Sequence, residues 1–164
     1  MNYIDVANGI VFQKMGISKD TFDHRLICQK KIYLLQSLGT DMGYSYNWYV
    51  RGPYSPALTT YVYNNLDVLS AISFSEYKLN SSAEANIDKV NGLSNTKPED
   101  LSTPLWYELL ASILYIYKNR NSKSWGNDGG DVALSNELIK MKPRFTDKHC
   151  QSALKSLRAS GFIK

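Results

Sequence analysis

Apolar residues recur every three or four positions in several separate stretches of the chain, as they do along one face of an amphipathic helix. The first stretch covers residues 3–15, and Gly16 follows it as a helix terminator. A short helix is also expected in the more polar segment 80–102, before a hinge at 95–98. The same spacing predicts further helices over residues 23–38, 56–66, 103–118, 131–141 and 147–160.

One stretch, Tyr44–Val50, alternates between aromatic and small polar side chains, which is the period of a β-strand. One face of this strand would carry Tyr44, Tyr46 and Trp48. Aromatic side chains favour such pleated surfaces. The sequence therefore predicts a short aromatic strand between two helices.

The strand is followed by Gly-Pro-Tyr-Ser-Pro at residues 52–56. The two prolines fix φ and bias the residues before them away from the helical region, and Pro56 suits the first turn of a helix. We expect a stiff corner that holds Arg51, Tyr54 and Ser55 in place. Ordered loops with polar and aromatic tips often carry function, although this corner can equally serve only to turn the chain.

These elements predict a mainly α fold with a short β-hairpin or small sheet, an α+β class with a winged-helix-like helical domain. A chain of 164 residues with 43% hydrophobic residues can form one core. We expect one compact domain built from a helix-strand-helix half at 1–79, a polar insert or linker at 80–102, and a helix-turn-helix-like half at 103–164.

Charge is distributed unevenly along the chain, although the net charge is only +4. Residues 118–164 hold ten Lys or Arg against four Asp or Glu, and residues 1–117 hold nine against eleven. Such asymmetry can mark a nucleic-acid surface, or it can simply be a solvated helix face. The candidate nucleic-acid contacts are Lys142, Arg144, Lys148, Gln151, Lys155 and Arg158.

Residue patterns that support catalysis or cofactor binding are lacking. The two histidines belong to no metal-binding spacing, and no nucleophile elbow or phosphate-binding loop occurs. Cys28 and Cys150 lie among apolar positions, which favours buried free thiols in a reducing cytoplasm. We expect a cytoplasmic, non-enzymatic protein without cofactor, metal, small-molecule substrate or membrane partner.

The runs QKKIYLLQSLG and YSYNWYVRGPYSPALTTYVY resemble the Panacea or SocA-like antitoxin and adaptor family, especially its YwgA-like relatives. The resemblance covers residues 26–66. It implies a small helical domain with a short sheet, related to winged-helix architecture, that neutralises or adapts a partner by contact in toxin–antitoxin or anti-phage systems. The matching positions are Lys30, Lys31, Tyr33, Trp48, Arg51, Gly52, Pro53, Tyr54, Ser55 and Pro56.

Two functional hypotheses follow. In the first, the protein is a protein–protein binding module or accessory subunit, since aromatic residues and arginine dominate interface energetics. In the second, it is a winged-helix-like DNA-binding protein that uses the basic residues named above. The candidate partner-binding residues of the first hypothesis are Tyr46, Trp48, Tyr49, Arg51, Tyr54 and Ser55.

Overall fold

The computed structural model describes residues 1–119 and 130–164, and within them the chain is mainly helical with one small antiparallel sheet. The predicted α+β class is therefore confirmed. The elements are α1 (Tyr3–Met15), α2 (Phe22–Ser37), β1 (Asn47–Tyr49), β2 (Gly52–Tyr54), α3 (Pro56–Ser70), α4 (Ser81–Gly92), the 3-10 helix η1 (Leu93–Thr96), α5 (Thr103–Asn119), α7 (Asp131–Met141) and α8 (Asp147–Ala159).

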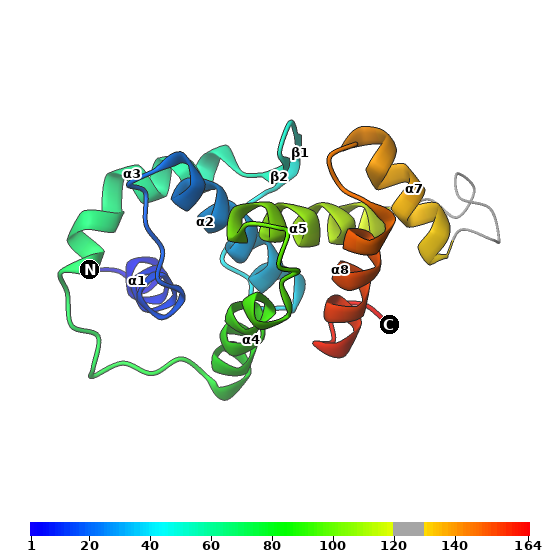
Figure 1. Cartoon of the computed structure of the whole chain (residues 1–164). Coiled ribbons are helices and arrows are strands. Elements are labelled where there is room, and N and C mark those ends of the chain that lie inside the picture. Colours follow the sequence, from blue (N-terminus) through cyan, green and yellow to red (C-terminus); the bar gives the residue numbers. More distant parts are fainter. Residues whose placement is uncertain (120–129) are drawn as a thin grey trace.

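Helix α5 forms the centre of the molecule, and in Figure 1 it crosses between α1 and α3 on one side and α7 and α8 on the other. Most of its side chains are buried, including Trp106 and Tyr107 at 0% exposure. The polar ends of these two rings donate hydrogen bonds to backbone carbonyls of Leu93 and Val90. A helix that is apolar around most of its circumference needs neighbours on every side, which explains its central place.

The helix boundaries follow capping signals in the sequence. Thr21, Ser55 and Thr146 accept hydrogen bonds from backbone N–H groups in the first turns of α2, α3 and α8. Gly16 ends α1 in the left-handed conformation at φ 64°. The expected helices at 3–15, 103–118 and 131–141 are confirmed to within a residue.

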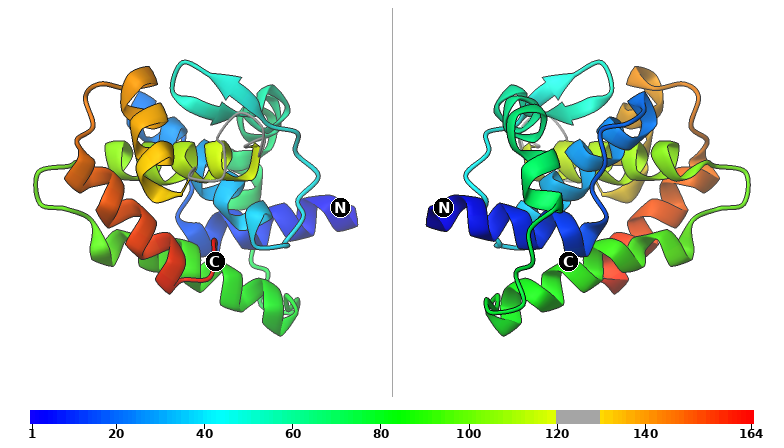
Figure 2. Two further views of the ribbon diagram at one scale, coloured as in Figure 1. Left: turned by 90° about the vertical axis from the view of Figure 1, so that its right-hand side faces the viewer. Right: turned by 90° about the vertical axis from the view of Figure 1, so that its left-hand side faces the viewer.

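The two strands form a hairpin whose turn is Val50–Arg51 and whose register pairs Trp48 with Pro53. The prediction of a turn at residues 52–56 was therefore wrong: Gly52–Tyr54 is the second strand, and only Ser55 and Pro56 start the helix. Gly-Pro indicated a turn because proline lacks a ladder donor, but an edge strand tolerates it. Figure 2 shows the hairpin projecting from the helices in both views.

The predicted alternation of faces holds along residues 44–49, although only 47–49 form a ladder. Tyr44, Tyr46 and Trp48 are partly buried against the core, and the residues between them are exposed.

The polar segment 80–102 packs against the rest of the molecule through α4 and η1. Ile87, Val90 and Leu93 are at most 2% exposed and belong to the same hydrophobic cluster as the buried residues of α2, α5 and α8. The apolar residues of this segment thus supply core contacts, and its buried Asn86 donates hydrogen bonds to the Leu38 carbonyl and the Thr40 hydroxyl.

Both cysteines are buried free thiols, as expected. Burial raises the pKa of Cys28 to about 12 and that of Cys150 to about 11. None of the helices in the described parts of the chain combines the length and apolar character needed to cross a membrane.

Candidate functional site

The hairpin rests on a polar cluster that is buried except for Arg51, which we call the hairpin seat and define as Lys30, Arg51, Glu108, Ser112 and Lys142. Glu108 belongs to α5 and is 1% exposed. Its two carboxylate oxygens accept hydrogen bonds from Lys142 Nζ at 3.0 Å and from Arg51 Nη1 at 3.2 Å. One buried carboxylate therefore links the hairpin turn to the segment that follows α7.

Two lysines of the seat also hold the hairpin backbone. Lys142 Nζ donates to the carbonyl of Val50 at 2.9 Å, and Lys30 Nζ donates to the carbonyl of Pro53 at 2.7 Å. Burial lowers the pKa of Lys30 to about 7, with Lys142 and Arg51 acting in the same direction and Glu108 opposing them. The seat thus holds three basic side chains against one carboxylate.

Gly52 makes a close approach to α5. Its φ is +95°, and a Cβ at this position would overlap Ser112 Oγ. Ser112 Oγ is buried and has no hydrogen-bond partner among the described residues. Glycine is therefore needed at position 52 both for its backbone conformation and for space.

Beside the seat lies an open, mainly apolar hollow of about 460 Å³, which we call the hairpin groove. It runs between the amino-terminal half of α2, the hairpin and the start of α3. Its apolar or aromatic walls come from Phe22, Leu26, Tyr49, Val50, Tyr54 and Tyr63, and its basic residues are Arg25, Lys30 and Arg51.

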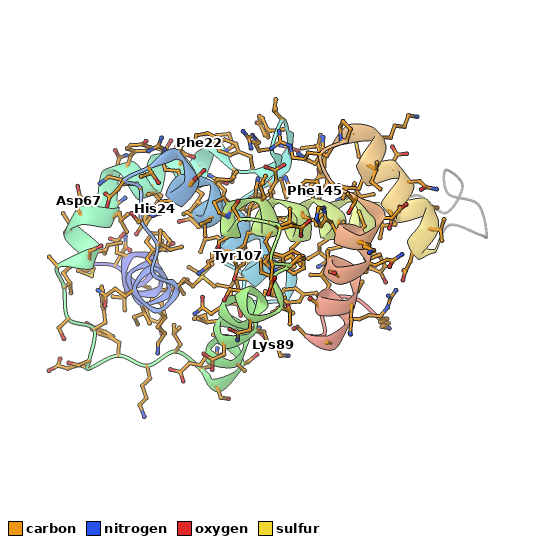
Figure 3. All side chains as sticks on the ribbon, in the orientation of Figure 1. Phe22, His24, Asp67, Lys89, Tyr107 and Phe145 are labelled. Carbon is orange, nitrogen blue, oxygen red and sulfur yellow. The ribbon has the colours of Figure 1, made fainter. Side chains whose placement is uncertain are left out.

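The rim of the hairpin groove exposes large apolar side chains. Phe22 is 54% exposed, Val50 92% and Tyr63 52%. Figure 3 shows Phe22 at the start of α2, on the same edge of the molecule as the hairpin. Exposed apolar residues scattered singly are ordinary, but several gathered at one hollow make it a candidate binding surface.

Three of the six residues predicted to bind a partner lie in this groove. Tyr49 is 44% exposed, and its ring meets that of Tyr54 edge to face at 5.1 Å. The hydroxyl of Tyr54 is hydrogen-bonded to Thr59 at 2.6 Å. The guanidinium of Arg51 lies 5.5 Å from the centre of the Phe22 ring. These contacts fix the rings and the cation in position.

The other three predicted residues support the fold. Tyr46 donates its hydroxyl hydrogen to the backbone of Gln29 and packs on Tyr33. The Trp48 ring lies 5.5 Å from the Tyr115 ring and 5.5 Å from the ammonium of Lys142. Ser55 is fully buried and caps α3, so it is not available to a partner in this structure.

Sequence reasoning missed the contributions of α2 and α3 to the groove. Phe22, Leu26 and Lys30 are spaced by four and therefore lie on one helix face. Phe22 could have been identified as a candidate because it is a large apolar residue in the first turn of α2, where polar residues are usual. Tyr63 follows Val62, a core residue, and no pattern in the sequence indicates that it faces the hairpin.

Of the six residues predicted to contact nucleic acid, two are paired with carboxylates within the protein. Lys142 is 7% exposed and committed to Glu108, so it is not available to phosphates in this structure. Arg158 forms two hydrogen bonds of 2.7 Å with the carboxylate of Asp131. Asp131 therefore neutralises the guanidinium of Arg158, a strongly basic group on α8.

The remaining members, Arg144, Lys148, Gln151 and Lys155, are exposed. A second hollow, between α7 and α8, contains Lys155 and Arg158 but also two carboxylates, Asp131 and Asp147. Mixed charge of this kind is poorly suited to a phosphate backbone.

His149 on α8, a group suited to acid–base chemistry, has structural partners on both ring nitrogens. His149 accepts from the backbone N–H of Thr146 and lies 2.7 Å from Asp100 through its other ring nitrogen. This contact lowers the pKa of the Asp100 carboxyl. Within residues 1–119 and 130–164, no group of three metal-ligating side chains comes together.

Comparison of the chain with family models, with curated proteins and with solved structures gives no match. The resemblance of residues 26–66 to the Panacea or SocA-like family therefore stays a prediction from their sequence.

Proposed function

We propose that this protein is a non-catalytic binding module that recognises a protein partner through the hairpin groove. The observation that carries the proposal is the convergence of exposed apolar side chains from three elements on one hollow: Phe22 from α2, Tyr49 and Val50 from the hairpin, and Tyr63 from α3. Burial of such aromatic anchors supplies most of the binding energy at protein interfaces.

The rigidity of the groove supports the same proposal. Arg51 is held by Glu108, and Tyr54 is held by Thr59 and by the Tyr49 ring. A surface that is ordered before binding loses less conformational entropy when the partner arrives. The groove can therefore reach useful affinity over a small area.

The resemblance of residues 26–66 suggests the biological setting. On that basis we propose an antitoxin-like or adaptor-like role, or that of an accessory subunit, in a bacterial toxin–antitoxin or anti-phage defence system. The acting residues in this role are Tyr49, Arg51 and Tyr54 with Phe22 and Tyr63.

The test is affinity capture from the native host with the tagged wild-type protein and two variants, each with and without nuclease. Tyr63→Ala removes a groove tyrosine that is 52% exposed, and Tyr3→Ala removes one that is 93% exposed on α1. We expect wild type and Tyr3→Ala to capture the same protein after nuclease treatment, and Tyr63→Ala to lose it. Circular dichroism confirms that the variants are folded.

If Tyr63→Ala captures the protein as well as the wild type does, the hairpin groove is not the binding site. Material that nuclease releases, and that Lys148→Glu with Lys155→Glu also loses, would favour the DNA-binding hypothesis instead.

A further inference from the structure

The charged side chains that line the hairpin groove all have the same sign. Arg25, Lys30 and Arg51 line it, and no carboxylate of residues 1–119 or 130–164 does. Glu108, the carboxylate behind Arg51, is 1% exposed and already shared with Lys142. Glu108 therefore offsets part of the charge of Arg51, whereas Arg25 has no carboxylate partner among the described residues.

Arg25 is the cation best placed to meet an incoming group. It donates one hydrogen bond, from Nη1 to the carbonyl of Lys19 at 2.8 Å, and forms no ion pair within the described part of the chain. A guanidinium has five donors in a planar fork, so most of those of Arg25 remain for a carboxylate.

Lys30, when protonated, adds positive charge from the floor of the groove. Its side chain is fully buried at the floor of the groove, and its ammonium donates to the Pro53 carbonyl. Burial lowers the pKa of this ammonium to about 7, so Lys30 is charged in only part of the molecules at neutral pH, and Arg25 and Arg51 supply the permanent positive charge of the groove. The potential in the hollow therefore favours a negative group.

The apolar surface extends beyond the hollow. Val50, at the tip of the hairpin, is 92% exposed, and Phe22 and Tyr63 are each more than half exposed. A small anion would leave these side chains in water. A polypeptide that crosses the groove would cover them and also carry the negative group.

We propose that the partner contributes an acidic and apolar segment, in which an Asp or Glu side chain pairs with Arg25 and Arg51 while flanking apolar side chains pack on Phe22, Tyr49 and Tyr63. This inference rests on the proposed function and specifies the chemistry of its partner. The aromatic groups supply most of the affinity, and the charges fix the register of the segment.

The test starts from a phage library of random twelve-residue peptides selected on the full chain. We expect enriched peptides to contain Asp or Glu beside aromatic or aliphatic residues. The most enriched sequence is then synthesised with an amidated carboxyl end, which separates a side-chain carboxylate from a terminal one. A second peptide carries the amide in place of the acidic side chain.

Binding of both peptides is measured for the wild type, Arg25→Gln and Lys155→Gln, the last removing an exposed cation outside the groove. Loss of a charge-assisted hydrogen bond should lower affinity about tenfold. We expect that loss when either Arg25 or the peptide acid is changed, little further loss when both are changed, and no effect of Lys155→Gln.

Selection that yields no peptide, or peptides without acidic enrichment, would overturn the inference. So would equal binding to wild type and Arg25→Gln, or displacement of the peptide by a 20-base-pair duplex. Host capture that depends on Tyr63 but not on Arg25 would leave the proposed function standing and remove only the acidic segment.

Discussion

At the scale of single residues, Gly52 and Ser112 determine how closely the hairpin packs against α5. The backbone of Gly52 has a positive φ, and the hydroxyl of Ser112 occupies the space where a side chain would begin. Left-handed backbone conformations cost about 1–2 kcal/mol for residues other than glycine. Overpacking adds about 1–3 kcal/mol.

We predict that Gly52→Ala lowers the free energy of unfolding by about 2–5 kcal/mol, from the sum of these two effects. Gly43→Ala is the matched control, since Gly43 has φ +82° and open space around its Cβ position, and it should lose only the backbone part. Urea denaturation measures both.

A second substitution separates the two causes. Ser112→Ala alone should leave stability nearly unchanged because the hydroxyl makes no hydrogen bond within the described residues. Gly52→Ala combined with Ser112→Ala should then cost no more than Gly43→Ala. If the double variant is as unstable as Gly52→Ala alone, the contact with Ser112 does not explain the glycine.

Lys30 gives stability a pH dependence. Its pKa is about 7 in the folded protein against 10.5 for an ordinary lysine. Between these values the unfolded chain binds a proton at Lys30 and the folded chain does not, so this residue makes stability rise with pH from about 7 upward. Below that range Lys30 is protonated in both states, and its contribution stops changing.

We predict that wild type gains stability relative to Lys30→Met between pH 7 and pH 9, by up to about 1.4 kcal/mol per pH unit. Above that window the Cys28 thiol, whose pKa is raised to about 12, acts in the opposite direction. Urea denaturation at several pH values gives the two slopes, with Lys155→Met as the surface control. Parallel slopes for wild type and Lys30→Met would contradict the assignment.

At the scale of elements, the hairpin depends on the carboxylate of α5. Glu108 accepts from Arg51 of the hairpin turn and from Lys142 beyond α7, and both contacts are within 3.2 Å. A buried carboxylate with two cationic partners leaves both of them unpaired when it is removed.

We predict that Glu108→Gln destabilises the protein by about 3–5 kcal/mol. Glu84→Gln breaks an exposed pair with Lys14 and should cost less than about 1 kcal/mol. Adding Lys142→Met to Glu108→Gln should recover part of the loss, because it removes an unpaired ammonium. Equal effects of the two glutamine variants in thermal denaturation would show that the hairpin is held in another way.

The elements also show how far the sequence predicts this fold. Helical spacing and capping residues placed the helices closely, because both signals are local. A short hairpin was predicted, but the position of its second strand was missed because a Gly-Pro pair indicates a turn when its partner strand is unknown. The hairpin seat was missed for a different reason: Lys142 reaches the Val50 carbonyl across 92 positions of sequence.

Two local signals of the seat were nevertheless present. Glu108 is the one charged residue in the apolar run 105–114 of a predicted buried helix, and Lys30 falls on the apolar face of another. Charged residues are almost never fully buried without a partner, so each of them indicated a polar cluster. Neither signal identifies the partner, which only tertiary contacts supply.

At the scale of the whole molecule, the hairpin groove exists only when α2, the hairpin and α3 are assembled. Tyr49, Arg51 and Tyr54 could be predicted as candidates because they lie close together in the chain. Phe22 and Tyr63 are brought to them by packing. The chain thus keeps three exposed apolar residues, Phe22, Val50 and Tyr63, beside a positively charged hollow, which is the basis for proposing a protein partner.

Site-specific photocrosslinking in the native host tests this central claim most directly. Benzoylphenylalanine is placed at Val50 on the groove rim, or at Val68 on α3, which is 64% exposed and lies outside the groove. We predict a discrete protein adduct from position 50 that persists after nuclease treatment, and none from position 68. Adducts of equal yield from both positions, or an adduct from position 68 alone, would contradict the account.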